Sequence, residues 1–362
     1  MDLSELLKYS VQYGASDLHL TIGRPPMVRI SGQLIPSGYE TELTPDETRA
    51  LVYSVLTDDQ KAKFEEEHEL DFSIGIPGVS RFRVNVFMQR GCVAGVFRTI
   101  GENIPQFGEL GLSETVRQLA LLPRGLVLVT GPTGCGKSTT LAAIINLINE
   151  QKQGHIVTIE DPIEFVHPHL RCTVNQRELG QDTFSFPRAL KSVLREDPNV
   201  ILVGEMRDLE TIAAALTLAE TGHLVLSTLH TQDAAQTVDR IIDVFPPYQQ
   251  EQIRVMLAAS LKGVISQILL PRADAAGRVA AREIMVVTPA IAALIRDAKT
   301  HQIYSAIQTG SREGMCTMEK SLGELCQAGL ITPEDALSKA NHPSELRALT
   351  QSQQQYHMQE RQ

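Results

Sequence analysis

The most chemically informative stretch of the sequence is the glycine-rich run GPTGCGKS at residues 131–138. It matches the pattern G-x-x-x-x-G-K-[ST] in full, follows the apolar run GLVLVT, and leads into the helical stretch STTLAAIINLINE. Glycines let successive backbone N–H groups point at phosphate oxygens, and the positive end of the following helix dipole adds to the attraction. We therefore predict a phosphate loop in which Lys137 bridges the β- and γ-phosphates of ATP and Ser138 holds Mg²⁺. The predicted nucleotide-binding residues are Gly131, Pro132, Thr133, Gly134, Cys135, Gly136, Lys137, Ser138 and Thr139.

The cysteines point to a reducing environment. Cys92, Cys135, Cys172, Cys316 and Cys326 are odd in number and include no C-x-x-C pair. This pattern favours free thiols over a disulfide framework or a zinc site. Cys135 lies inside the phosphate loop, and helix N-termini lower the pKa of a thiol, so we expect Cys135 to be sensitive to oxidation.

Acids and a histidine follow the apolar runs downstream of the loop. Glu160, Asp161 and Glu164 come after HIVTI, Glu205 after VILVG, and His230 after LVLSTL. Ligands of doubly wound sheets bind at the carboxyl ends of the strands, so Glu205 is predicted to reach the Mg²⁺ shell and the group around His230 to sense the γ-phosphate. A single strand-end acid also serves as a helix cap, and a single histidine is often structural. The prediction rests on their convergence at one edge of the sheet.

The spacing of apolar residues predicts two parts of different class. Beyond residue 112, continuous apolar strands alternate with helices, which is typical of a parallel sheet covered on both faces. The strands are predicted at 125–130, 155–159, 199–204 and 223–229, the helices at 138–149, 187–195, 208–220 and 234–242, a hairpin at 265–270 and 279–287, and helices from 288 onward. Residues 1–100 read as an α+β module with a helix at 3–13, a strand at 16–20, a hairpin at 27–30 and 33–35, a helix from Thr44, and a meander at 70–74, 80–88 and 93–99.

Composition excludes several classes of protein. The chain has 362 residues, a formal net charge of −10, no Trp and 5% aromatic residues. An acidic chain poor in aromatic residues is unlike a nucleic-acid-binding protein, and no nucleic-acid partner is expected. The start MDLSELLKYS lacks the positive charge of a signal peptide, and no apolar stretch approaches the roughly 20 residues that span a bilayer. We expect a cytoplasmic protein.

Four motifs together resemble a known family. GPTGCGKSTT, VTIEDPIEFVH, LREDPNVILVGEMRD and STLHT are similar in order and spacing to the Walker A, Asp box, Walker B and His box of the type II/IV secretion ATPase superfamily, and in particular of type IV pilus retraction ATPases. GASDLHL, FRVNVF and TPAIAALIRDAKTHQIYSAIQTG extend the resemblance over nearly the whole chain. It implies an α/β fold with a RecA-like P-loop NTPase domain preceded by a small α+β PAS-like domain. The expected bounds are 1–100 for the PAS-like domain, 101–112 for a linker, 113–345 for the ATPase domain with C-terminal helices, and 346–362 for a flexible tail.

The resemblance also implies roles for individual residues. Glu164 matches the glutamate that polarises the attacking water, Glu205 the Walker B glutamate and His230 the His-box residue, with Lys137 at the phosphates. Ser138 and Glu205 would hold Mg²⁺, the latter through water. The family supplies arginines to the nucleotide from the first domain, and the matching candidates are Arg81, Arg83 and Arg98.

The resemblance further implies a homohexamer that hydrolyses Mg-ATP to power pilus retraction and twitching motility. Its partner would be the inner-membrane platform protein of the pilus, with a paralogous retraction ATPase as a second partner, so the chain would be recruited peripherally to the inner face of the cytoplasmic membrane.

The sequence departs from the retraction family at three places. Cys135 replaces a common Ser, Asn199 replaces an Asp, and the retraction motif reads AIAALIRD at 290–297. Its matching residues are Ala290, Ile291, Leu294, Ile295 and Arg296. The altered motif leaves an accessory, PilU-like retraction ATPase as the nearest alternative. An assembly or type II secretion ATPase fits less well, because the chain lacks the tetracysteine zinc site of that group. A non-motor regulator and a nucleic-acid translocase remain as alternatives from other classes.

Overall fold

The computed structural model describes residues 2–30, 32–100 and 104–349. The chain divides into two units, one formed by Met1–Asn103 with Pro162–Val166 and the other by Ile104–Asp161 with His167–Gln362. In the described ranges, no helix combines the length and the apolar character needed to cross a membrane.

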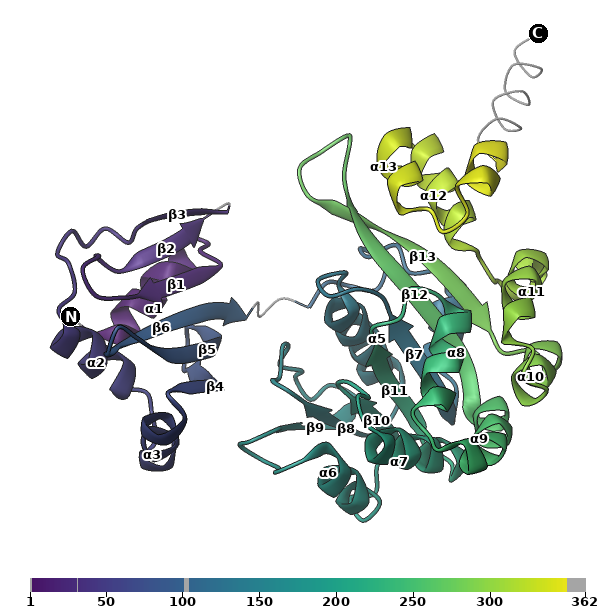
Figure 1. Ribbon diagram of the computed structural model, residues 1–362, viewed down its shortest axis with the longest axis horizontal. Coiled ribbons are helices and arrows are strands. Elements are labelled where there is room, and N and C mark those ends of the chain that lie inside the picture. Colours follow the sequence, from purple (N-terminus) through teal and green to yellow (C-terminus); the bar gives the residue numbers. More distant parts are fainter. Residues whose placement is uncertain (1, 31, 101–103, 350–362) are drawn as a thin grey trace, which may run out of the picture. The chain divides into compact units, whose positions relative to one another are not determined.

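The first unit is built on a six-stranded antiparallel sheet with the order β3-β2-β1-β6-β5-β4 (Figure 1). The strands are β1 (Asp17–Leu20), β2 (Met27–Ile30), β3 (Gln33–Pro36), β4 (Glu69–Ile76), β5 (Ser80–Gln89) and β6 (Cys92–Ile100). The predicted hairpin and meander are confirmed, although Ser31 of the hairpin turn lies outside the described residues. Along β5, Phe82, Val84 and Val86 are buried, so the alternating polar residues of that strand lie on the opposite face.

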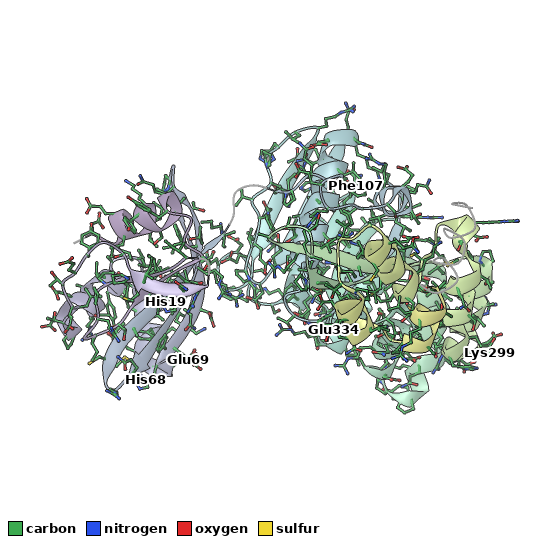
Figure 2. All side chains as sticks on the ribbon, turned by 90° about the horizontal axis from the view of Figure 1, so that it is seen from above. His19, His68, Glu69, Phe107, Lys299 and Glu334 are labelled. Atoms are coloured by element: carbon green, nitrogen blue, oxygen red, sulfur yellow. The ribbon has the colours of Figure 1, made fainter. Side chains whose placement is uncertain are left out.

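Three helices accompany this sheet, namely α1 (Leu3–Gln12), α2 (Pro45–Tyr53) and α3 (Asp58–Glu67). The predicted start of α2 is confirmed by a capping box, in which the Thr44 hydroxyl accepts from the Glu47 N–H and the Glu47 carboxylate accepts from the Thr44 N–H. His68 caps the C-terminus of α3 with a φ of 62°, and Glu69, labelled beside it in Figure 2, begins β4. Leucines of α1 and α2 pack with the buried residues of β1, β5 and β6 in one core.

The second unit contains a seven-stranded sheet with the order β13-β12-β7-β11-β10-β8-β9 (Figure 1). The strands are β7 (Gly125–Thr130), β8 (Gly154–Glu160), β9 (Cys172–Glu178), β10 (Val200–Val203), β11 (Leu224–Leu229), β12 (Leu261–Pro271) and β13 (Arg278–Val286). All neighbours pair in parallel except β12 and β13, which form the predicted hairpin. The carboxyl ends of β7, β8, β10 and β11 therefore lie along one edge.

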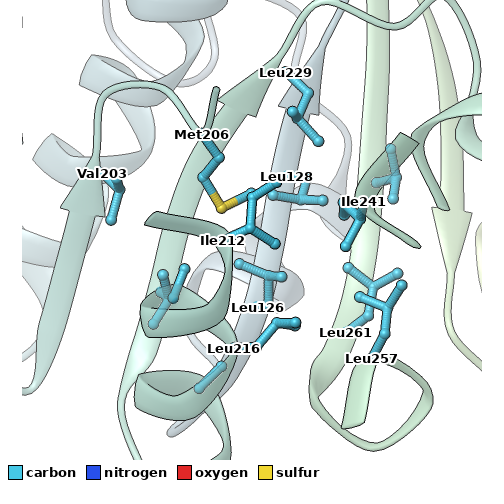
Figure 3. Close-up of a cluster of buried hydrophobic side chains, with 14 of the residues drawn as sticks. Leu126, Leu128, Val203, Met206, Ile212, Leu216, Leu229, Ile241, Leu257 and Leu261 are labelled. Atoms are coloured by element: carbon cyan, nitrogen blue, oxygen red, sulfur yellow. The ribbon is translucent and has the colours of Figure 1, made fainter. Parts of the chain in front are cut away.

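Both faces of this sheet are covered, as predicted. Along β7, Leu126 and Leu128 pack into one core, which Figure 3 shows. Val127 and Val129 pack into a second core on the other face. The first core also receives α6 (Phe186–Val193), α7 (Leu209–Glu220), α8 (Ala234–Asp243), α9 (Pro247–Ser260), α10 (Pro289–Arg296) and α11 (Ile303–Thr309), and the second receives α4 (Glu114–Ala120) and α5 (Lys137–Gln151). A strand that contributes to two cores has no polar face, which explains the continuous apolar runs.

The segments expected to be a linker and a tail take part in packing where they are described. Phe107 and Leu112 are buried in the core beside α4 and α5, whereas 101–103 lie outside the described residues. Helices α12 (Met318–Gln327) and α13 (Pro333–Lys339) pack on the β12–β13 hairpin, and Leu346 is buried in the same cluster. The remainder of the expected tail, 350–362, is outside the described residues.

Candidate functional site

The phosphate loop lies between β7 and α5, in the strand–loop–helix context that the motif requires. Gly136 precedes the helix with φ 86°, in the left-handed region that favours glycine, and no side chain caps the helix N-terminus. The N–H groups of Ser138 and Thr139 in the first turn have no acceptor among the described residues, so they can bind an anion. Gly131 approaches the backbone of β12 so closely that a Cβ atom there would collide with the Gln267 carbonyl oxygen.

Lys137 is folded back over this loop. Its side chain is buried, and Nζ donates to the Gly131 carbonyl at 2.9 Å and the Pro132 carbonyl at 3.1 Å. Nζ also lies 3.3 Å from Nδ1 of His230, at the end of β11. The structure thus brings the predicted lysine and histidine together at the sheet edge.

Glu205 joins the same group from the loop after β10. Its Oε1 lies 3.1 Å from Nε2 of His230 and 2.8 Å from Nε of Arg207. Partial burial works to raise the pKa of Glu205, but the hydrogen bond from Arg207 and the charges of His230 and Arg207 hold it below its ordinary value. Glu205 is therefore ionised at neutral pH and connects, through His230, to Lys137.

Arg207 is a site residue that the sequence reasoning missed. Its guanidinium is largely exposed, and the paired Glu205 carboxylate, with Asp161 nearby, raises its pKa. The available signal is its position two residues after the strand-end acid in the run GEMRD.

The lack of space at Gly204 accounts for the position of the acid after β10, at residue 205 instead of 204. A Cβ atom at 204 would lie 3.3 Å from both the Glu160 Cα and the Ile159 carbonyl oxygen of β8. The Thr228 hydroxyl donates to the Gly204 carbonyl at 2.7 Å and ties β10 to β11 at this level. Because β8 leaves little room for a side chain at position 204, the carboxylate is carried by the next residue.

The acids after β8 have different surroundings. The Glu160 carboxylate accepts from the Thr158 hydroxyl at 2.6 Å and from the Gln176 amide at 3.2 Å, so it is engaged within its own sheet. Asp161 is exposed and lies near enough to Arg207 to raise its pKa. Glu164 is exposed and belongs to Pro162–Val166, which groups with the first unit.

The prediction that Cys135 is sensitive to oxidation is wrong. Its side chain is only 3% exposed, and burial raises the pKa of the thiol, outweighing the opposing influence of Lys137. A buried neutral thiol is poorly reactive. Asn199, in contrast, has a structural role, because its side-chain oxygen accepts the His155 N–H at 2.8 Å at the start of β8.

The three candidate arginines lie on one face of the first unit's sheet and differ in their partners. Arg98 pairs with Asp17 at 2.9 Å, and Arg81 donates to the Ser73 hydroxyl at 2.6 Å. Arg83 is exposed, and its guanidinium has no hydrogen-bond or ion-pair partner among the residues that the structure describes. Arg83 is therefore the candidate whose charge is free for a ligand.

The altered retraction motif forms α10. Ile291 and Ile295 are fully buried in the core, whereas Ala290 and Arg296 are exposed and Leu294 is partly buried against the core. Only part of the motif can therefore touch another molecule.

The donor set is consistent with a magnesium ion bound together with a nucleotide. The described residues contain no group of three His, Cys, Asp or Glu side chains that could hold a metal by themselves. Mg²⁺ is commonly bound by one or two protein oxygens together with substrate phosphates. Ser138, at the first turn of α5, and the ionised Glu205 are oxygen donors of that kind.

Comparisons with known proteins agree with this geometry. The family model described as Type II/IV secretion system protein matches residues 68–354. The type IV pilus retraction ATPase PilT of Pseudomonas aeruginosa is 54% identical over 95% of this chain and 99% of its own length, and the type IV pilus ATPase PilU of the same organism is 44% identical over 96% and 91%. A crystal structure of the pilus retraction motor PilT with bound ADP superposes with a TM-score of 0.90, at 50% identity, over 96% of this chain and 99% of that chain.

The family model covers most of the sequence, and the relatives match both units of the chain. The fold, with a parallel sheet that carries a phosphate loop, is that of the retraction motor structure. On these grounds the chain belongs to the type II/IV secretion system protein family, among its pilus retraction ATPases, and is an ATP-hydrolysing enzyme.

Proposed function

We propose that the chain is a homohexameric motor that hydrolyses Mg-ATP to power type IV pilus retraction and twitching motility. The observation that carries this proposal is the 54% identity to a retraction ATPase over nearly the full length of both chains. The Lys137–His230–Glu205 group at the sheet edge supports it, because phosphoryl transfer beside a phosphate loop uses a lysine at the phosphates and a strand-end acid near Mg²⁺. The chain would act at the inner face of the cytoplasmic membrane, on the platform protein of the pilus.

In this mechanism the chain supplies position and charge. The N–H groups at the start of α5 and the Lys137 ammonium would hold the phosphates. Ser138 and Glu205 would hold Mg²⁺, which would supply positive charge beside the transferred group. Glu164 would take a proton from the attacking water, His230 would face the γ-phosphate, and an arginine of the first unit would stabilise the transition state. Arg83 is the best candidate for this arginine because its guanidinium is free.

The general base is tested with Glu164→Gln. The amide cannot accept the proton, so ATP should still bind but turn over about 10²-fold more slowly, the scale of general-base catalysis. Steady-state phosphate release and binding of a fluorescent ATP analogue measure the two quantities. Wild-type turnover by this variant would refute the assignment of Glu164.

The biological role is tested by complementation. The gene should restore twitching to a strain that lacks its retraction ATPase, and the Lys137→Ala gene should not. An accessory, PilU-like role is the second candidate, favoured by the altered motif on α10 and by the 44% identity to PilU. It predicts rescue only when the strain retains its principal retraction ATPase.

A further inference from the structure

A buried amide connects the β12–β13 hairpin to the phosphate loop. Gln267 on β12 is 1% exposed. Its Nε2 donates to the Cys135 carbonyl at 2.7 Å, and its Oε1 accepts from the Thr140 hydroxyl on α5 at 2.9 Å. One side chain therefore bonds both to the loop and to the first turn of the helix that follows it.

The pairing of β12 with β7 determines this placement. The two strands run in parallel with Ser266 opposite Thr130, and their hydroxyls are hydrogen-bonded at 2.8 Å. Gln267, the next residue, thus reaches the level at which β7 turns into the loop. Gly131 leaves room for the Gln267 backbone, and a Cβ atom at Gly136 would lie 3.4 Å from Nε2 of Gln267.

The bond to Cys135 has a consequence for the next N–H group. In a trans peptide the C=O and N–H point in opposite directions, so a donor that holds the Cys135 carbonyl also orients the Gly136 N–H away from β12. In the described part of the chain this N–H has no acceptor. We propose that Gln267 is a positioning residue that holds the Cys135–Gly136 peptide in the orientation needed to bind nucleotide phosphate. The inference rests on the proposed function of the phosphate loop.

The test is the Gln267→Met variant, which conserves length and removes both bonds. ADP affinity should fall about tenfold, because the peptide loses its buried donor and is free to rotate. Binding of a fluorescent ADP analogue gives the affinity directly. The rise in Tm that saturating ADP produces gives a second value, which depends on affinity and not on the stability of the unliganded chain.

Asn149→Leu is the matched control, at the other end of α5. Asn149 is also fully buried, and its amide bonds to the Pro168 carbonyl at 2.7 Å and to the Leu170 and Cys172 N–H groups at 3.2 Å each. This variant should lower Tm while leaving ADP affinity at the wild-type value. Wild-type affinity in Gln267→Met, or an equal loss in Asn149→Leu, would overturn the inference.

Two further variants keep the result interpretable. If Gln267→Met does not fold, Thr140→Val removes only the bond that steadies the Gln267 amide, and it should weaken ADP binding by about threefold. Unchanged affinity in that variant would refute the role of Gln267. Lys137→Ala separates the two proposals, since normal ADP binding by Lys137→Ala would refute the phosphate loop itself. Loss of binding in Lys137→Ala, together with normal binding in Gln267→Met, would refute only the inference.

Discussion

The sheets of the two units gather polar side chains in different ways. In the second unit, Lys137, Glu205 and His230 meet because parallel strands all end at one edge of the sheet. In the first unit, the antiparallel register places polar residues side by side in a row across the strands. Ser73, Arg83, Arg98, Asp17 and Arg29 are successive partners from β4 to β2, and we call them the cross-strand row.

One buried acid from each sheet, Asp17 from the first and Glu283 from the second, can be compared, and the surroundings of these two carboxylates are opposite. Asp17 lies between Arg98 at 2.9 Å and Arg29 at 3.6 Å. Burial works to raise the pKa of Asp17, but hydrogen bonds from Ser16 and Arg98 and the charge of Arg98 hold it below its ordinary value. Glu283 on β13 accepts the Ala234 N–H at 2.8 Å and has no cationic partner among the residues that the structure describes, and burial raises its pKa to about 7. The difference teaches that a cationic partner, and not burial alone, decides whether each of these two carboxyl groups is ionised.

The largest effect is expected in the cross-strand row. Arg83→Ala should lower kcat by about 10³-fold if its free guanidinium acts as an arginine finger. Arg98→Ala should cost less, because Asp17 already engages that guanidinium. Steady-state ATP hydrolysis ranks the two variants, and a loss in Arg98→Ala that equals or exceeds the loss in Arg83→Ala would reverse the assignment.

The next largest effect is expected in the strand-end group, by which we mean Lys137, Glu205 and His230. Glu205→Gln removes the charge that pairs with Arg207 and His230, and kcat should fall about 10²-fold, as for the loss of one electrostatic stabiliser. Glu160→Gln is the control one strand away, because its carboxylate is already engaged by Thr158 and Gln176. Equal losses in the two variants would show that convergence at the edge does not select Glu205.

The raised pKa of Glu283 should make the stability of the chain depend on pH. Glu283 takes up a proton on folding between its ordinary pKa of 4.5 and its folded pKa of about 7, so stability falls as pH rises across that window and levels off above it. Glu283→Gln removes this penalty and keeps an acceptor for the Ala234 N–H. Its Tm relative to wild type should therefore increase by several degrees between pH 5 and pH 8. A difference that does not change with pH would mean that Glu283 is ionised in the folded chain.

The smallest effect is expected at Asp17, where the pH dependence of stability has the opposite sign to that at Glu283. Because its folded pKa is lowered, its stabilising contribution is present above its ordinary pKa of 3.8 and is lost as pH falls. Asp17→Asn should cost about 1 kcal/mol in the free energy of unfolding at pH 7, since the Arg98 partner is largely exposed to solvent. Denaturant titrations at pH 7 and pH 3 should show the cost shrinking at the lower pH. A larger cost at pH 3 would contradict the pairing.

The strand-end group could be predicted because it depends on local sequence alone. Each of these residues comes shortly after an apolar run that forms a strand. Parallel strands in one sheet have their carboxyl ends at the same edge, so the residues that follow them lie close together. Gln267 could not be found in this way, because its role depends on the pairing of β12 with β7. Arg207 was overlooked although it follows the strand-end acid Glu205 by two residues. Strand β9 was missed because it lies at the edge of the sheet and its sequence, CTVNQRE, is mostly polar, so it lacks the continuous apolar run of the other parallel strands. Cys135 was misjudged because the sequence shows the helix N-terminus but not the burial that outweighs it.

The cross-strand row makes the charge of one sheet face opposite to that of the whole chain. It carries three arginines and one aspartate in a protein whose formal net charge is −10. An anionic group is repelled by the protein at long range and attracted by this row at short range. Ionic strength acts on the two interactions unequally, because the Debye length is about 10 Å in 0.1 M salt and the distant charges are screened first. Contacts made through this face therefore persist at salt concentrations that abolish the long-range repulsion.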